Sequence, residues 1–125
     1  MAEYEQKAKN FFILGKISEK LNMYTEAAAN YFKALTALND HVLEKINLRA
    51  TDHNERFALL KENLPDLYEL TDRLFILYRR TYTQQLSLGE LILLRQKVEE
   101  AFHHATIDIP TDEEIENKTE RLYKN

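Results

Sequence analysis

The chain contains no cysteine, and this absence removes several kinds of chemistry at once. A disulfide framework, a zinc or iron–sulfur site with thiolate ligands, and a cysteine nucleophile are all excluded. The absence is also compatible with a reducing compartment. We therefore expect neither redox chemistry nor a fold that is held together by disulfides.

Glycine and proline are nearly as scarce, with only two of each in 125 residues. So few helix-breaking residues favour long helices. Because 44% of the residues are hydrophobic and 30% are charged, the composition also excludes collagen-like, low-complexity and wholly disordered chains. The length suits one domain and is too short for two independent cores.

Long apolar runs are missing as well. The runs at residues 11–14 and 91–94 are only four residues long, and the charged first residues do not form an apolar leader segment. We therefore expect a soluble, cytoplasmic protein without a membrane partner.

The chain has no excess of positive charge, since its formal net charge is −4. Six acidic and three basic residues follow residue 106, so the rest of the chain is nearly neutral. Bulk electrostatics therefore give no general attraction to nucleic acid. Binding of RNA or DNA would need a local basic patch.

Helical periodicity is the clearest positive signal. Apolar residues recur every three or four positions over residues 4–21 and again from Thr25, which can serve as an N-cap, to about Leu48. The second of these helices would be about 36 Å long, which is typical of a bundle helix with equally long neighbours. The apolar row of the first helix consists of Tyr4, Ala8, Phe11 and Gly15, flanked by Leu14, Ile17 and Leu21.

Capping signals mark three further helices. Asp52 followed by Glu55 begins a short helix, and Pro65 ends that helix and begins a third long one. Ser87-Leu88-Gly89-Glu90 is an S-x-x-E capping box that begins a fourth long helix. The short connections between these segments favour antiparallel neighbours.

A final acidic helix is predicted after Thr111, and its only sizeable apolar residues are Ile115, Leu122 and Tyr123. We expect it to dock weakly or fray because it offers so little apolar surface. The predicted fold is all-α: an up-and-down bundle of four long helices with one short intervening helix and a C-terminal acidic helix. Residues 1–106 would form the bundle and residues 107–125 the acidic tail.

Few motifs in the sequence carry chemistry. Glu100 and His103 have the spacing found in di-iron bundles, but such a site needs a second pair and further inward carboxylates. Neither glycine belongs to a phosphate-binding loop, and no G-x-S-x-G elbow occurs. We predict no metal site, no cofactor and no catalytic residue.

Two groups of basic residues could bind phosphate. Lys9, Lys16 and Lys20 share one face of the first helix, where interleaved acids weaken their field. The segment Tyr78-Arg79-Arg80-Thr81-Tyr82 combines guanidinium groups, which fit phosphate, with rings that stack on bases. In the alternative interpretation, the tyrosines pack in the bundle and the arginines pair with acids of neighbouring helices.

The first two predicted helices resemble a single tetratricopeptide repeat. The resemblance is carried by Phe11, Leu14, Gly15, Tyr24, Ala27, Tyr31 and Ala34. Only one repeat is visible, which disfavours a solenoid. An open groove beside Ala27 and Tyr31 would make this helix pair a peptide-binding scaffold.

The same stretch, residues 23–35 (MYTEAAANYFKAL), resembles the second-helix signature of the HEPN (higher eukaryotes and prokaryotes nucleotide-binding) superfamily. Asp52-His53-Asn54-Glu55-Arg56-Phe57 stands where these proteins often carry a His, and residues 78–82 look like their Arg–aromatic region. The resemblance covers residues 3–105 and implies a small helical bundle, commonly a homodimer. Members are often encoded beside a nucleotidyltransferase, and several branches are metal-independent RNase toxins.

Active members of that superfamily have an Arg and a His with four to six residues between them, and this sequence lacks that spacing. Three residues separate Arg49 from His53, and seven separate Arg95 from His103. We therefore expect a non-catalytic binding or regulatory module that belongs to a toxin–antitoxin or nucleotidyltransferase-associated system. The candidate RNA- or partner-binding residues are His53, Arg56, Arg79, Arg80 and Tyr82.

Two alternatives remain open. One is a metal-independent RNase in which His53 and Arg79 or Arg80 meet in space, since catalytic partners need not be neighbours in the chain. The other is the tetratricopeptide-like interaction scaffold.

Overall fold

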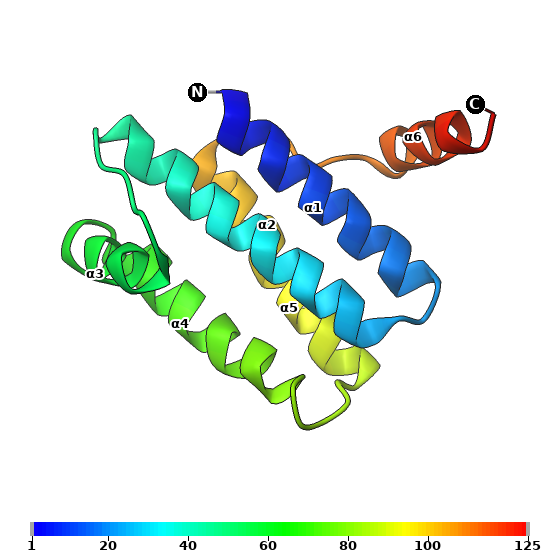
Figure 1. Ribbon diagram of the computed structural model, residues 1–125, viewed down its shortest axis with the longest axis horizontal. Coiled ribbons are helices and arrows are strands. Elements are labelled where there is room, and N and C mark those ends of the chain that lie inside the picture. The colour runs from blue at the N-terminus through cyan, green and yellow to red at the C-terminus, as the bar shows by residue number, and fades with distance from the viewer. Residues whose placement is uncertain (1, 125) are drawn as a thin grey trace.

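The structure, a computed structural model, describes the backbone of residues 2–124 and the side chains of residues 3–120 (Figure 1). Within that range it contains helices and no strand, so the predicted all-α fold is confirmed. The helices are α1 (Ala2–Lys20), α2 (Tyr24–Lys45), α3 (His53–Asn63), α4 (Pro65–Arg80), α5 (Leu88–Ala105) and α6 (Asp112–Lys124). The long helices α1, α2, α4 and α5 form a bundle in which α2 is central and packs against the other three (Figure 1).

Three helices begin where their capping signals predict. The Asp52 carboxylate accepts the backbone N–H of Glu55 at 2.8 Å, and Pro65 stands in the first turn of α4. Ser87 and Glu90 form a reciprocal capping box at the start of α5. These side chains satisfy or replace backbone donors that would otherwise lack partners.

Helix α2 differs from the prediction at both ends. It begins at Tyr24 and not after a Thr25 cap, because Met23 precedes the helix and provides no side-chain cap hydrogen bond. It ends at Lys45, before the predicted Leu48, because Asn47 adopts a left-handed backbone with φ of 62°. The N–H of Leu48 then turns back to the Leu43 carbonyl at 3.0 Å, which closes the helix end.

The main core lies where α1, α2 and α5 meet. The Phe12 ring packs against the Tyr31 ring with centroids 5.4 Å apart and edge-on against Phe102 at 5.3 Å. Gly15 allows α1 to approach α2 closely, since a Cβ at this position would lie 2.5 Å from the nearest atom of the Tyr31 ring. The sequence placed Leu14 and Leu21 beside this face, but they are 48% and 64% exposed. The buried face of α1 is therefore narrower than the predicted one.

A polar network ties the same three helices together. The Tyr31 hydroxyl donates to the Glu19 carboxylate at 2.8 Å, and Arg95 of α5 also donates to that carboxylate. Burial is the main cause that raises the pKa of the Tyr31 phenol, and the hydrogen bond to Glu19 raises it further. Burial, the largest single cause, would lower the pKa of Arg95, but the hydrogen bond and the charge of Glu19, together with the nearby Tyr31 and Glu99, outweigh burial and raise this pKa. Sequence periodicity gave no signal for this network.

A smaller apolar cluster holds α3 and α4 on α2. Leu43, Leu60 and Leu67 are buried together. Beside them, the fully buried Asn39 amide donates to the Thr71 hydroxyl at 2.8 Å and joins α2 to α4. The first half of α4 is therefore firmly attached to α2.

Helix α6 lies beside α1, outside the bundle of long helices (Figure 1). Ile115 is its buried apolar side chain, and its polar contacts with α1 join Lys118 to Asn10 at 2.9 Å and Asp112 to Lys16 at 3.7 Å. The predicted apolar residues Leu122 and Tyr123 lie outside the described side chains. Weak docking and fraying of α6 both stay predictions.

Candidate functional site

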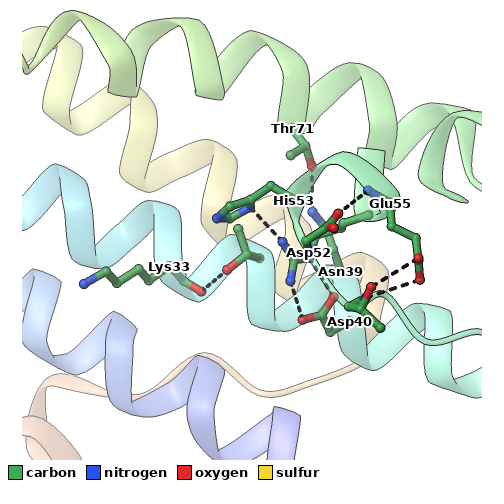
Figure 2. Close-up of polar contacts among 10 residues, drawn as sticks. Lys33, Asn39, Asp40, Asp52, His53, Glu55 and Thr71 are labelled. Atoms are coloured by element: carbon green, nitrogen blue, oxygen red, sulfur yellow. Dashed lines mark hydrogen bonds and ion pairs between the residues drawn. The ribbon is translucent and has the colours of Figure 1, made fainter. Parts of the chain in front are cut away.

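Two of the predicted binding residues, His53 and Arg56, meet in the first turn of α3. The Arg56 guanidinium donates from Nη1 to His53 Nδ1 at 2.8 Å. Because a guanidinium only donates, Nδ1 must accept, and His53 therefore carries its proton on Nε2. Figure 2 shows this turn of α3 above Asp40 of α2.

The same guanidinium is held by Asp40 through two hydrogen bonds. Arg56 Nε donates to Asp40 Oδ1 at 2.7 Å and Nη2 donates to Oδ2 at 3.0 Å. Both side chains are largely buried, so this bidentate pair compensates the Arg56 charge and anchors α3 to α2. His53 remains exposed. The pairing of Arg56 with His53 is foreseeable from helical spacing, whereas Asp40, on another helix, carries no sequence signal.

The other predicted binding residues lie at the C-terminal end of α4, which carries Arg79 and Arg80, and in the turn after it, which carries Tyr82. Arg80 Nη1 pairs with Glu90 Oε2 of α5 at 2.8 Å, and the Arg79 guanidinium lies over the Phe75 ring at 5.8 Å. Tyr82 is 73% exposed, and its hydroxyl donates to the Tyr78 hydroxyl at 3.2 Å. This hydrogen bond, with partial burial, raises the pKa of Tyr78 to about 12. The structure therefore places the five predicted residues in two groups.

Aromatic rings from α2, α3, α4 and the turn after α4 form a continuous ladder between the two groups. Its closest step is the stacked pair of Phe32 and Tyr78, with centroids 4.8 Å apart and planes 3° from parallel. The full order is Tyr68, Phe57, Phe75, Phe32, Tyr78 and Tyr82. Packing of Tyr78 on Phe32 and pairing of Arg80 with Glu90 agree with the interpretation in which this segment serves the bundle.

A groove of about 600 Å³ lies between α4 and α5. Leu74 is buried in its floor, and Ile76 and Leu93 stand on its opposite walls with 58% and 50% of their surface exposed. The remaining lining residues are Asp66, Glu69, Leu70, Arg73, Leu77, Arg80, Glu90, Lys97, Glu100 and His104. The groove is thus apolar along its middle and charged along its rims. Sequence periodicity did not reveal it, because it depends on how far the two helices diverge.

The Arg80–Glu90 pair closes one end of this groove. The backbone N–H and hydroxyl of Ser87 donate to Glu90 at 3.2 Å and 3.1 Å. These bonds, followed by the nearby Arg80 guanidinium, lower the pKa of the Glu90 carboxylate. The Glu90 carboxylate therefore has two roles: it belongs to the capping box of α5, and it forms the ion pair with Arg80 that joins α4 to α5.

Other motifs singled out in the sequence have ordinary surface contacts. Glu100 pairs with Lys97 at 3.1 Å, while His103 is exposed. Lys16 pairs with Asp112 of α6. Among the residues that the structure describes, no group of three or more His, Cys, Asp or Glu side chains could hold a metal ion. None of the helices in this range is both long enough and apolar enough to cross a membrane.

Comparisons with known proteins found no family model, no curated protein and no solved structure that matches this chain. The resemblance to HEPN proteins therefore stays a prediction.

Proposed function

We propose that this protein is a non-catalytic binding module that holds an amphipathic helix of a partner protein in the groove between α4 and α5. The observation that carries this proposal is the pair of half-exposed side chains, Ile76 and Leu93, on facing walls of an apolar groove with charged rims. Docking of an amphipathic helix covers such side chains and leaves the rim charges in contact with water.

The first helix pair is a poorer candidate for peptide binding. Ala27 and Tyr31, which would line a tetratricopeptide-like groove, are fully buried beneath neighbouring helices. A partner could reach them only by unpacking the core.

The contacts of Arg56 support a non-catalytic role. In an RNase, a cation must stabilise phosphate charge beside a general acid or base. Arg56 is the guanidinium that contacts His53, and its charge is already compensated by the bidentate bond to Asp40. Metal-independent cleavage of RNA by the purified protein, abolished by His53→Ala, would overturn this part of the proposal.

The family resemblance adds finer expectations to this proposal. They are a homodimer, a nucleotidyltransferase partner and a cytoplasmic location. RNA or partner contacts would be made through His53, Arg56, Arg79, Arg80 and Tyr82. Sedimentation, reconstitution with a nucleotidyltransferase encoded nearby, RNA titration and cell fractionation would test them separately.

A synthetic peptide tests the groove directly. The peptide is as long as α4, at 16 residues, carries leucines along one helical face and has neutral glutamines elsewhere. We expect the protein to bind it with a Kd of about 10 to 100 μM, measured by fluorescence anisotropy. Ile76→Asp with Leu93→Asp should weaken binding at least about tenfold, because these changes put charge on the apolar walls.

Leu14→Asp is the matched control, because Leu14 is also half exposed but lies on α1 outside the groove. Equal losses in the control and in the groove variant would contradict the proposed binding surface.

A further inference from the structure

The position of each rim charge follows from the register of α4 and α5. Helices α4 and α5 are antiparallel, and the Arg80–Glu90 ion pair shows which residues of the two helices lie opposite each other near the loop that connects them. Counting seven residues, two helical turns, back along α4 and forward along α5 brings Arg73 opposite Lys97. Both residues line the groove, as this register requires. Two positive charges therefore stand on opposite rims, about halfway along the groove.

Neither cation has an acidic partner across the groove. Arg73 pairs with Glu69 at 3.0 Å, and Lys97 pairs with Glu100 at 3.1 Å. Each pair lies on a single helix and is largely exposed, and pairs of this kind contribute only about 0.3 to 0.5 kcal/mol. A carboxylate placed between the two walls would face both cations, whose exposed pairs with Glu69 and Glu100 contribute little.

The apolar walls lie one helical turn away from these cations. The same register sets Leu77 opposite Leu93, four residues from Arg73 and Lys97 on each helix. Consider a partner helix with an apolar side chain packed between Leu77 and Leu93. Its side chain one helical turn farther along would then lie between Arg73 and Lys97.

We propose that the occupant of the α4–α5 groove is a partner helix with an aspartate or glutamate one turn from an apolar anchor. The carboxylate binds between Arg73 and Lys97 while the anchor packs on Leu77 and Leu93. This inference rests on the proposed function, because it specifies the charge of the partner for the same groove. A second copy of this chain is the competing occupant.

Three peptides of the same length test the charge of the partner. All carry the same leucine face, and the position one turn from the central leucine is glutamate, glutamine or lysine. We expect the glutamate peptide to bind at least about tenfold more tightly than the lysine peptide. The difference should shrink when salt rises from about 0.1 M to about 1 M, because the Debye length falls from about 10 Å to about 3 Å.

Charge-removing variants identify the groove cations. Arg73→Gln with Lys97→Gln should reduce binding of the glutamate peptide to the level of the glutamine peptide and leave binding of the glutamine peptide unchanged. Arg79→Gln is the control, because Arg79 is an exposed cation of α4 that does not line the groove. Circular dichroism should show that all variants are folded.

The possible failures are distinguishable. Equal binding of the three peptides would overturn the carboxylate inference and leave the proposed function standing. Binding of none of them would overturn both. A dimer in sedimentation experiments that Leu93→Asp dissociates would show that a second copy occupies the groove, which would also overturn the inference.

Discussion

Single residues decide how closely the helices of this protein approach one another. Gly15 faces the Tyr31 ring, whose hydroxyl is held by Glu19 on the same helix as Gly15. The ring is fully buried and bonded at its far end, so it has little freedom to move aside. The distance between α1 and α2 therefore depends on the absence of a side chain larger than hydrogen at Gly15.

Gly15→Ala should consequently destabilise the protein. The added methyl group would lie 2.5 Å from the ring, and overpacking of this kind costs about 1 to 3 kcal/mol, more than the gain of up to about 1 kcal/mol in helix propensity. Gly89→Ala is the matched control, because the nearest atom to its Cβ is the Ser87 hydroxyl oxygen at 4.0 Å. Urea unfolding followed by circular dichroism measures both, and equal stability of the two variants would refute the steric argument.

At the scale of a helix, the sequence predicted where most helices begin, but it did not predict the contacts between helices. Asp52, Pro65 and Ser87 mark the starts of α3, α4 and α5 because each acts on backbone groups within its own first turn. The start of α2 was misplaced because Met23 provides no side-chain cap. The bond between Arg56 and Asp40 joins residues from two helices, so no local pattern encodes it.

The capping box of α5 makes the stability of the protein depend on pH. Hydrogen bonds from Ser87 and the nearby Arg80 lower the pKa of Glu90 in the folded protein. The resulting stability is fully present above the pKa of Glu90 in the unfolded chain, and it is lost as the pH falls through the lower folded value. Glu90→Gln should therefore lower the melting temperature at pH 7 and have progressively less effect in acid.

Thermal melts of the original protein and the Glu90→Gln variant between pH 7 and pH 3 measure this dependence. A difference in melting temperature that stays constant over that range would show that the charge of Glu90 does not stabilise the capping box.

For the molecule as a whole, the periodicity of apolar residues predicted the helical bundle, because four amphipathic helices can bury their apolar faces in few other arrangements. The same periodicity did not predict the groove between α4 and α5. Leu70, Leu74 and Leu77 have the same helical spacing whether α5 covers them fully or stands apart from them. The residues that carry the proposed function are therefore recognisable only once the separation of the two helices is known.

The C-terminal segment should contribute to stability unevenly along its length. Ile107 and Pro110, before α6, are buried, whereas Ile115 is the buried apolar side chain among those of α6 that the structure describes, and the polar contacts of α6 are exposed. Fully burying one such side chain contributes about 1.5 to 3 kcal/mol, and exposed ion pairs add little. Deleting residues 111–125 should therefore lower the free energy of unfolding by about 1 to 3 kcal/mol and leave a cooperatively folded bundle.

A second deletion, from residue 107 onward, is the comparison for this truncation. It also removes Ile107, which packs in the main core with Phe102 and Ala105 of α5, so it should cost at least about 1.5 kcal/mol more. Urea unfolding of both truncated proteins measures the difference. If deleting residues 111–125 alone abolished cooperative unfolding, α6 would be an integral part of the bundle, because the burial of Ile115 could not account for so large a loss.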